Sequence, residues 1–187
     1  RKHNVKNLVF SSTAAVYGMI ESVPVTEDAK LDPINVYGRS KLMVENIIRD
    51  YNHAYKMNAV VLRYFNAAGA ATDGSNGERH DPESHLIPIM INKLLHNESL
   101  TVNGTDYPTP DGTAVRDYVH VQDIAQAHVL ALEYADFENA FNIFNIGTGT
   151  GYSIKQVIET LQKVTGKEVK VEYGPRREGD PAQLVAS

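Results

Sequence analysis

The chain has 187 residues, no cysteine, a formal net charge of −5 and a sequence pI of about 5.8. The acidic balance argues against a nucleic-acid-binding surface, and no apolar run approaches the roughly 20 residues that cross a membrane. The lack of cysteine excludes disulfides and thiolate metal sites, which fits a cytoplasmic location.

Apolar runs and capping signals predict alternating strands and helices. Five strands are expected, at residues 8–10, 59–65, 100–102, 141–146 and 169–173. Four helices are expected: from an Asn35 cap to about residue 56, over 86–94 after Ser84 or His85, over 124–135 after an Asp123 cap, and from a Ser153–Gln156 capping box to near Gly166. This alternation is typical of an α/β protein with a parallel sheet.

The first predicted strand leads into hydroxyl side chains, and a tyrosine–lysine pair follows. The strand is followed by Ser11, Ser12 and Thr13, and Tyr37 and Lys41 lie four residues apart on the next helix. Side chains at that spacing share one helical face. Open α/β sheets bind ligands at the carboxyl ends of their strands. The pattern predicts a phenol that exchanges protons, beside an ammonium group that favours the phenolate.

An ordinary helical face would explain the pair alone, so its context matters. Positions 37, 41, 44, 48, 51 and 55 follow helical spacing and carry mostly apolar side chains. We therefore expect this stripe to face the core. A core-facing ammonium needs a partner or a task.

Two glycine-containing segments are predicted to be loops. Residues 147–151 read Gly-x-Gly-x-Gly, but Tyr152 stands where a dinucleotide-binding fingerprint has glycine, so we expect a strand-to-helix turn. No other segment carries such a fingerprint, which hydride-transfer enzymes need for the cofactor pyrophosphate. Residues 69–82 are rich in polar residues and glycine and predict a surface loop.

Eight ordered segments carry a resemblance to a known family. They are FSSTAAVYG at 10–18, YGRSK at 37–41, LRYFN at 62–66, GE at 77–78 leading to HLIP at 85–88, DYPT at 106–109, DGT at 111–113, RDYVHV at 116–121 and PRREGD at 175–180. Together they resemble the UDP-glucose 4-epimerase family of NAD-dependent extended short-chain dehydrogenases/reductases. The likeness covers essentially the whole chain.

The resemblance implies a partial Rossmann-like α/β fold that contains only the later strands of the parallel sheet. Residues 1–66 and 116–147 would form the later half of the dinucleotide-binding domain. Residues 67–115 and 148–187 would form a smaller UDP-sugar-binding region. The glycine-rich first units of the family and its last helices have no counterpart here, so the chain is expected to be truncated at both ends.

The implied reaction interconverts UDP-glucose and UDP-galactose, as in galactose metabolism, with NAD as cofactor. C4 of the sugar is oxidised, the 4-keto sugar rotates, and hydride returns to the other face. The resemblance makes Tyr37 the base, places Lys41 on the nicotinamide ribose, and has Thr13 relay the proton of the 4-hydroxyl group. Phe65 would contact nicotinamide, and Ser11 would also bind the cofactor. The alternative for Thr13 is a hydroxyl that only satisfies backbone groups.

The resemblance also assigns residues to the UDP-sugar. They are Asn66, His85, Leu86, Thr101, Asn103, Arg116, Arg177, Asp180 and Leu184. The arginines would grip the phosphates bidentately, and Asp180 would hold a ribose hydroxyl. Surface ion pairs with Asp117 and Glu178 are the alternative for the two arginines.

Neighbouring residues separate related reactions. Sugar-nucleotide dehydratases need carboxylates just after the position of Thr13, whereas this chain has Ala14 and Ala15, which cannot move protons. This favours epimerisation. The medium-sized Leu184 favours a plain hexose, and UDP-N-acetylhexosamine or UDP-pentose epimerisation stays open.

Other hypotheses concern the state of the chain. A catalytically inactive fragment that binds UDP-sugars is the main alternative to an enzyme. A homodimer through the helix of Tyr37 is expected in the intact protein.

The histidines of the polar loop are not expected to bind a metal, and His120 and His128 are not expected to be catalysts. Glu78, His80, Asp81, Glu83 and His85 lie in the polar loop without a helical pair of histidines four residues apart, so no metal site is predicted. His120 and His128 are expected to pack or to form hydrogen bonds.

Overall fold

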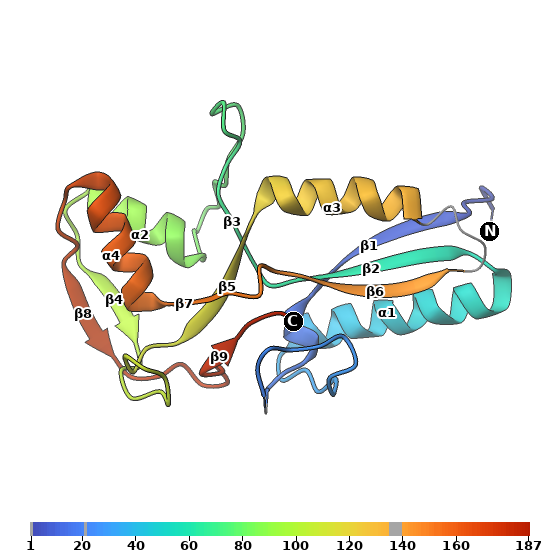
Figure 1. Cartoon of the computed structure of the whole chain (residues 1–187), viewed down its shortest axis with the longest axis horizontal. Coiled ribbons are helices and arrows are strands. Elements are labelled where there is room, and N and C mark those ends of the chain that lie inside the picture. Colours follow the sequence, from blue (N-terminus) through green and yellow to red (C-terminus); the bar gives the residue numbers. More distant parts are fainter. Residues whose placement is uncertain (1, 21, 135–139) are drawn as a thin grey trace.

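The computed structural model describes residues 2–20, 22–134 and 140–187. The molecule is elongated, with one α/β layer arrangement at each end and short strands between them (Figure 1). This arrangement confirms the α/β class that the sequence predicts.

A three-stranded parallel sheet forms one end. Its order is β1 (Asn7–Thr13), β2 (Asn58–Tyr64) and β6 (Phe141–Ile146). Helix α1 (Val36–Tyr55) covers one face and α3 (Val121–Tyr134) covers the other (Figure 1). The central strand β2 is buried over five successive residues, as expected for a strand covered on both faces. Because the strands are parallel and in register, β1 and β2 end together at Thr13 and Tyr64.

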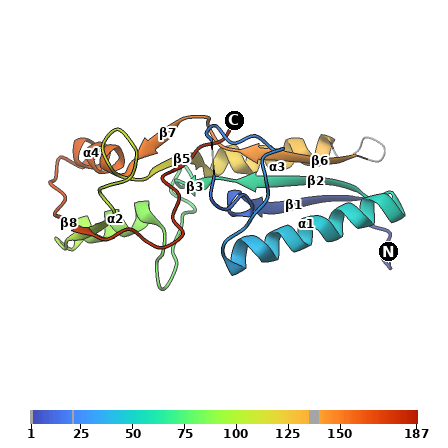
Figure 2. The ribbon, with the colours of Figure 1, turned by 90° about the horizontal axis from the view of Figure 1, so that it is seen from below.

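A second, mixed sheet lies in the middle of the molecule. It contains β3 (Asn66–Ala68), β5 (Val115–His120), β7 (Gly151–Ser153) and β9 (Gln183–Leu184). At the other end, β4 (Leu100–Asn103) pairs with β8 (Val171–Gly174), beside α2 (Leu86–Leu95) and α4 (Ile154–Thr165) (Figure 2). These last elements enclose a separate apolar core of Met90, Leu100, Val102, Ile158 and Val169.

The five predicted strands are present, although the last begins later than predicted, at Val171. The sequence analysis missed β3, β5, β7 and β9. Strand β5 lacks a clear apolar alternation because one of its fully buried residues is Asp117. The other three strands have two or three residues each, too few to show a period.

The helix signals were mostly correct. Asn35 caps α1 by accepting a 2.7 Å hydrogen bond from the Gly38 amide, and the Ser153–Gln156 capping box opens α4. The predicted Asp123 cap is wrong, because α3 already begins at Val121 and Asp123 lies in its first turn. There its negative charge stabilises the positive end of the helix dipole. The predicted end at Ala135 lies outside the described residues.

The predicted core-facing stripe of α1 is largely wrong. The buried residues are Gly38, Glu45 and Ile48, whereas Tyr37 and Tyr51 are exposed. Gly38 explains the shift, because a Cβ at this position would lie 2.5 Å from the Ala15 carbonyl oxygen. The helix therefore approaches the chain after β1 most closely at Gly38, one residue beyond Tyr37.

The glycine-containing segment 147–151 joins β6 to β7 and precedes α4 by way of that short strand. The buried Asp117 carboxylate accepts hydrogen bonds from the amides of Thr148 (2.8 Å), Gly149 (3.0 Å) and Ala186 (3.2 Å). A cofactor phosphate would need such amides. The contacts fit the prediction that this segment is a structural turn.

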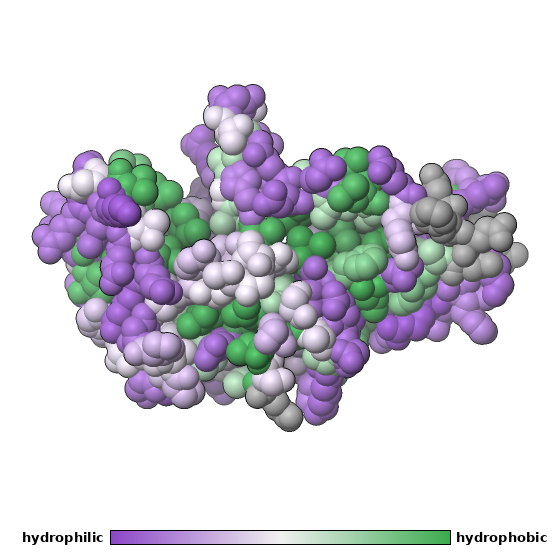
Figure 3. Space-filling view, in the orientation of Figure 1, coloured by the Kyte–Doolittle hydropathy of each residue, from purple (hydrophilic) through white to green (hydrophobic). Residues whose placement is uncertain are grey.

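The loop after β3 is exposed over most of residues 69–82, as predicted, and polar side chains cover its projecting tip (Figure 3). Of the described residues, none belongs to a helix with the length and apolar character of a membrane span.

Candidate functional site

A cavity of about 1000 Å³ lies between the carboxyl edge of the parallel sheet and the region of α2 and β4. Eleven residues that the sequence analysis assigned to cofactor or substrate line it. They are Thr13, Tyr37, Phe65, Asn66, His85, Leu86, Thr101, Asn103, Arg116, Arg177 and Asp180. Three others, Ser11, Lys41 and Leu184, are not among its lining residues. Segments more than 160 residues apart in sequence thus meet at one site, from Thr13 to Asp180.

Tyr37 and Lys41 face each other at the start of α1. The Lys41 Nζ lies 5.7 Å from the centre of the Tyr37 ring and 5.1 Å from that of Phe10. It donates a 2.8 Å hydrogen bond to the Ser11 carbonyl oxygen, which anchors it to the end of β1. The ammonium is therefore held near the phenol, as the helical spacing predicts.

Thr13 ends β1 and caps the short 3-10 helix η1 (Ala14–Val16). Its hydroxyl oxygen accepts a 3.1 Å hydrogen bond from the Ala15 amide. Thr13 therefore does satisfy a backbone group, as the alternative for this residue proposed. It leaves the hydroxyl proton available, because a hydroxyl both donates and accepts.

A hydrogen-bonded group lies beside the tyrosine–lysine pair. The Tyr64 hydroxyl lies 2.8 Å from Ser11 Oγ and 2.6 Å from His128 Nε2, and His128 Nδ1 lies 2.8 Å from the Ile124 carbonyl oxygen. The pKa of Tyr64 is raised, mainly because its hydroxyl is partly buried. The hydrogen bond with Ser11 opposes this increase, and a negative charge on Tyr37 adds to it. The prediction of a hydrogen-bonding role for His128 is confirmed. Tyr64 lines the cavity, and the sequence analysis did not assign it to the site.

A buried ionic network supports the same strand ends. Arg63 and Glu45 are almost fully buried and form two hydrogen bonds, of 2.7 and 3.1 Å. The Ser12 hydroxyl also donates to Glu45, and Arg63 donates a 2.9 Å hydrogen bond to the Tyr17 hydroxyl. The network ties α1 to β1 and β2 directly beneath Thr13. The sequence does not indicate this network, since a glutamate on an amphipathic helix predicts a solvent-facing position.

Two arginines also line the cavity. Arg116 forms an ion pair with Asp180, so the alternative pairing with Asp117 is wrong. Asp117 instead uses its carboxylate for the amides of the loop after β6. With the Asn103 amide oxygen turned toward Arg177, the Nε and Nη2 atoms of Arg177 lie 3.0 and 3.2 Å from it. Among the described residues, Arg177 has no ion pair with Glu178, the other alternative.

Asn66 presents an unused donor to this site. It lines the cavity at the start of β3, and its Nδ2 atom is buried without a hydrogen-bond partner among the described residues. An unpaired buried amide is costly. A ligand oxygen would satisfy it.

Phe65 and Leu184 have packing roles. Phe65 belongs to the core cluster around Val16 and Tyr17, and its amide donates a 3.0 Å hydrogen bond to Ile146. Leu184 packs against the same cluster and pairs with Arg116 in the neighbouring strand. Its assigned contact with the sugar stays a prediction.

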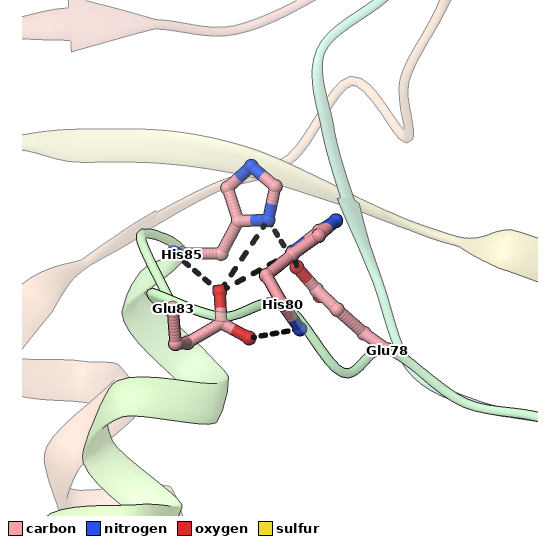
Figure 4. Close-up of side chains that lie close together, drawn as sticks. All are labelled: Glu78, His80, Glu83 and His85. Carbon is pink, nitrogen blue, oxygen red and sulfur yellow. Dashed lines mark hydrogen bonds and ion pairs between the residues drawn. The ribbon is translucent and has the colours of Figure 1, made fainter.

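Four side chains of the loop before α2 gather at the cavity wall (Figure 4). The Glu78 Oε1 lies 2.9 Å from His80 Nδ1 and also contacts His85 Nδ1. Glu83 accepts hydrogen bonds from the amides of His85 (2.9 Å) and Ser84 (2.7 Å). The His85 amide, aided by those of Ser84 and His80, lowers the pKa of Glu83 to about 2, against a smaller opposing effect of desolvation.

The described residues fit the nicotinamide ribose of NAD better than its pyrophosphate. Lys41 and Tyr37, next to Ser11, offer a cation and hydroxyl groups at the sheet edge, as a nicotinamide ribose requires. The Gly-x-Gly-x-Gly loop offers no comparable site for the pyrophosphate, because Asp117 already accepts from two of its amides.

Comparison with known proteins matches residues 1–147 to the family model of the NAD dependent epimerase/dehydratase family. The chain is 51% identical to a UDP-glucose 4-epimerase of Corynebacterium glutamicum over 188 residues, which is 100% of this chain and 56% of that protein. It is 50% identical to that of Lacticaseibacillus casei over 98% of this chain and 56% of that protein. The chain thus spans about half the length of the curated relatives it matches.

Solved structures agree with the fold. A UDP-glucose 4-epimerase from Stenotrophomonas maltophila with bound NAD and formylated UDP-arabinopyranose superposes with a TM-score of 0.93 at 40% identity, over 97% of this chain and 55% of that one. The enzyme from Bifidobacterium longum in complex with NAD+ and UDP gives a TM-score of 0.92 at 41% identity, over 100% of this chain and 56% of that one.

Proposed function

Because the chain belongs to the NAD dependent epimerase/dehydratase family, we propose that it is the part of a UDP-glucose 4-epimerase that binds the UDP-sugar and moves the proton of its 4-hydroxyl group. One observation carries the proposal. The phenol, the hydroxyl, the amide and the two arginines assigned to these tasks all line a single cavity. Its volume of about 1000 Å³ is in the range of ligand pockets.

The proton transfer would use groups of this chain. Thr13 keeps a hydroxyl proton to share with the sugar oxygen, and Tyr37 accepts the proton that leaves. The nearby Lys41 ammonium stabilises the negative charge that the phenol carries while it acts as a base. NAD, when bound, would supply the acceptance and return of the hydride at C4.

The nucleotide would be held by two arginines that line the cavity. Arg116 and Arg177 offer planar guanidinium groups to phosphate oxygens. Asn103 orients Arg177 and Asp180 orients Arg116, so both forks are held in place before a ligand enters. Asn66 adds an unpaired donor that lines the same cavity.

Epimerisation is favoured over dehydration because the residues after Thr13 are Ala14 and Ala15. They form η1 directly beside the proposed base and supply no carboxylate. A sugar elimination needs a further acid or base at this place.

A UDP-sugar-binding fragment without catalytic activity is the second candidate. It is supported by the loop after β6, whose amides are already occupied by the Asp117 carboxylate. Absorbance or mass measurements on the purified chain decide whether it retains NAD. Retained NAD would contradict the fragment hypothesis.

We propose the homodimer contact at the exposed apolar face of α1. Val36, Met43, Ile47 and Tyr51 are all exposed on this helix, at 74%, 63%, 55% and 42%. Apolar groups gathered on one helix face favour burial against a partner.

The proposed activity is testable in a hybrid enzyme. The chain would replace the matching residues of the Corynebacterium glutamicum relative, which supplies the remaining part. We expect the hybrid to convert UDP-galactose to UDP-glucose, measured by coupled UDP-glucose oxidation. The unmodified relative is the positive control. A folded hybrid that holds NAD and binds UDP but leaves UDP-galactose unchanged would contradict the proposal.

Substitution of Arg177 by alanine should weaken UDP binding by the chain. Loss of charge-assisted hydrogen bonds costs about 1.5–3 kcal/mol, or roughly a 10- to 150-fold increase in Kd. Isothermal titration with UDP measures the change. Arg49→Ala is the control, because Arg49 is exposed on α1 and contacts Asn46 and Phe141 instead. An unchanged Kd for Arg177→Ala would remove Arg177 from the nucleotide site.

A further inference from the structure

The loop between β3 and α2 brings together two imidazole nitrogens and two carboxylate oxygens. The ligand atoms of Glu78, His80, Glu83 and His85 all lie within 4.8 Å of one another. The Nδ1 atoms of both histidines turn toward the carboxylates (Figure 4). In the sequence, His80 precedes Glu83 and His85 follows it. Asp81, which the sequence places in the same group, is not part of this cluster.

The cluster lacks a compensating cation. The side chains of Glu78 and Glu83 are only 20% and 15% exposed. Among the residues that the structure describes, no lysine or arginine forms an ion pair with either carboxylate. Neutral imidazoles would leave two partly shielded negative charges side by side, which is electrostatically unfavourable.

The backbone fixes part of the cluster in advance. Glu83 Oε1 accepts from the Ser84 and His85 amides, and these bonds hold the carboxylate against the start of α2. Among the described residues, neither histidine has a hydrogen-bond partner at Nε2. Each imidazole is therefore free to carry its proton there and to present a bare Nδ1 to an ion.

We propose that Glu78, His80, Glu83 and His85 bind one divalent cation of the zinc class. Two nitrogen and two oxygen donors suit tetrahedral Zn²⁺. Bonds of about 2.0–2.2 Å place the ligand atoms of such a site roughly 3.4 Å apart. Three of the four distances between the imidazole nitrogens and carboxylate oxygens, 2.9, 3.5 and 4.0 Å, lie around that value. The fourth contact, between His85 Nδ1 and Glu78 Oε1, is closer and would have to open to admit the ion.

The site differs from what sequence spacing predicts. A helical His pair was absent, so no metal site was expected. The donors come instead from a turn, in which residues two to seven positions apart fold back on each other. An ion here would tie the exposed loop after β3 to the first turn of α2, at the wall of the cavity but away from Tyr37.

Metal titration of the 187-residue chain, prepared without a histidine tag, tests the proposal without any UDP-sugar. We expect Co²⁺ to bind with one-to-one stoichiometry and to give the intense visible bands of tetrahedral coordination. Zn²⁺ should displace it and raise the Tm of the chain. Binding should weaken as the pH falls, because protons compete for the imidazoles.

Ligand variants locate the ion. His80→Ala and Glu78→Gln should each weaken Co²⁺ binding at least about a hundredfold, since loss of even an outer partner costs 10- to 100-fold. Asp81→Asn is the matched control in the same loop, and His96→Ala is the control for an exposed histidine elsewhere, at the end of α2. Both should bind like the parent. Circular dichroism confirms that each variant is folded.

Three results would overturn the proposal. They are the absence of saturable binding below millimolar Co²⁺, an octahedral spectrum only, and equal affinity of the His80→Ala and Asp81→Asn variants. In each of these cases the cluster would be a purely hydrogen-bonded turn. Because no nucleotide is present, none of these results bears on the proposed epimerase activity.

Discussion

Replacement of Glu45 by alanine is expected to lower the free energy of unfolding by about 3–5 kcal/mol. The variant leaves the buried Arg63 guanidinium without its carboxylate partner and removes the acceptor of the Ser12 hydroxyl. A buried charge without a partner costs more than the ion pair itself contributes. Urea unfolding of the chain, followed by circular dichroism, measures the change.

Two further variants separate charge from side-chain size. Glu159→Ala removes an exposed glutamate of α4 and should change the free energy of unfolding by less than about 0.5 kcal/mol. The double variant Glu45→Leu with Arg63→Met removes both charges and should be less destabilised than Glu45→Ala alone. An equal loss in the double and single variants would show that packing, and not the unpaired charge, dominates.

Substitution of Tyr37 by phenylalanine in the hybrid enzyme should lower kcat by a factor of about 10²–10⁴. The ring and its contact with Lys41 are kept, whereas the hydroxyl that exchanges the proton is lost. UDP binding should be preserved, because both arginines proposed to hold its phosphates are kept. Steady-state kinetics and isothermal titration of UDP measure the two effects.

Tyr51→Phe is the matched control for this experiment. Tyr51 lies on the same helix, is exposed and contacts the Tyr55 ring at 5.0 Å. Its substitution should leave kcat unchanged. Undiminished turnover of the Tyr37→Phe hybrid would show that another group serves as the base.

The fold was predictable from the sequence in segments where a single physical rule determines the local structure. Strand β2 carries an apolar run over residues 59–62 because both of its faces are covered, and Ser153 with Gln156 marks the start of α4 by its side-chain chemistry alone. The α/β class follows from such segments in alternation. Strand β5 could not be found this way, because Asp117 is buried there by amides from two distant segments.

The buried face of α1 shows the same limit. Helical spacing identifies stripes on that helix but not which one meets the sheet, and the close approach at Gly38 decides this in three dimensions. Glu45 is buried because Arg63 on β2 lies opposite it. A single sequence does not show that pairing.

Motifs identified eleven residues that line one cavity, and their roles stay predictions. The contacts between site residues were not predictable. Asp180 pairs with Arg116 and Asn103 contacts Arg177, although about 60 to 75 residues separate each pair. The place of Tyr64 beside the site could not be predicted either, because its hydroxyl contacts Ser11 and His128, which come from two other elements.

The Asp117 carboxylate has a mechanical consequence for access to the cavity. It joins β5, the turn after β6 and the final residues of the chain through one anion. Arg116 and Asp180 line the cavity next to this junction. The junction therefore limits the outward movement of both residues. The final residues of the chain are therefore fastened to the strand that carries Arg116, whereas most residues of the loop after β3 are exposed.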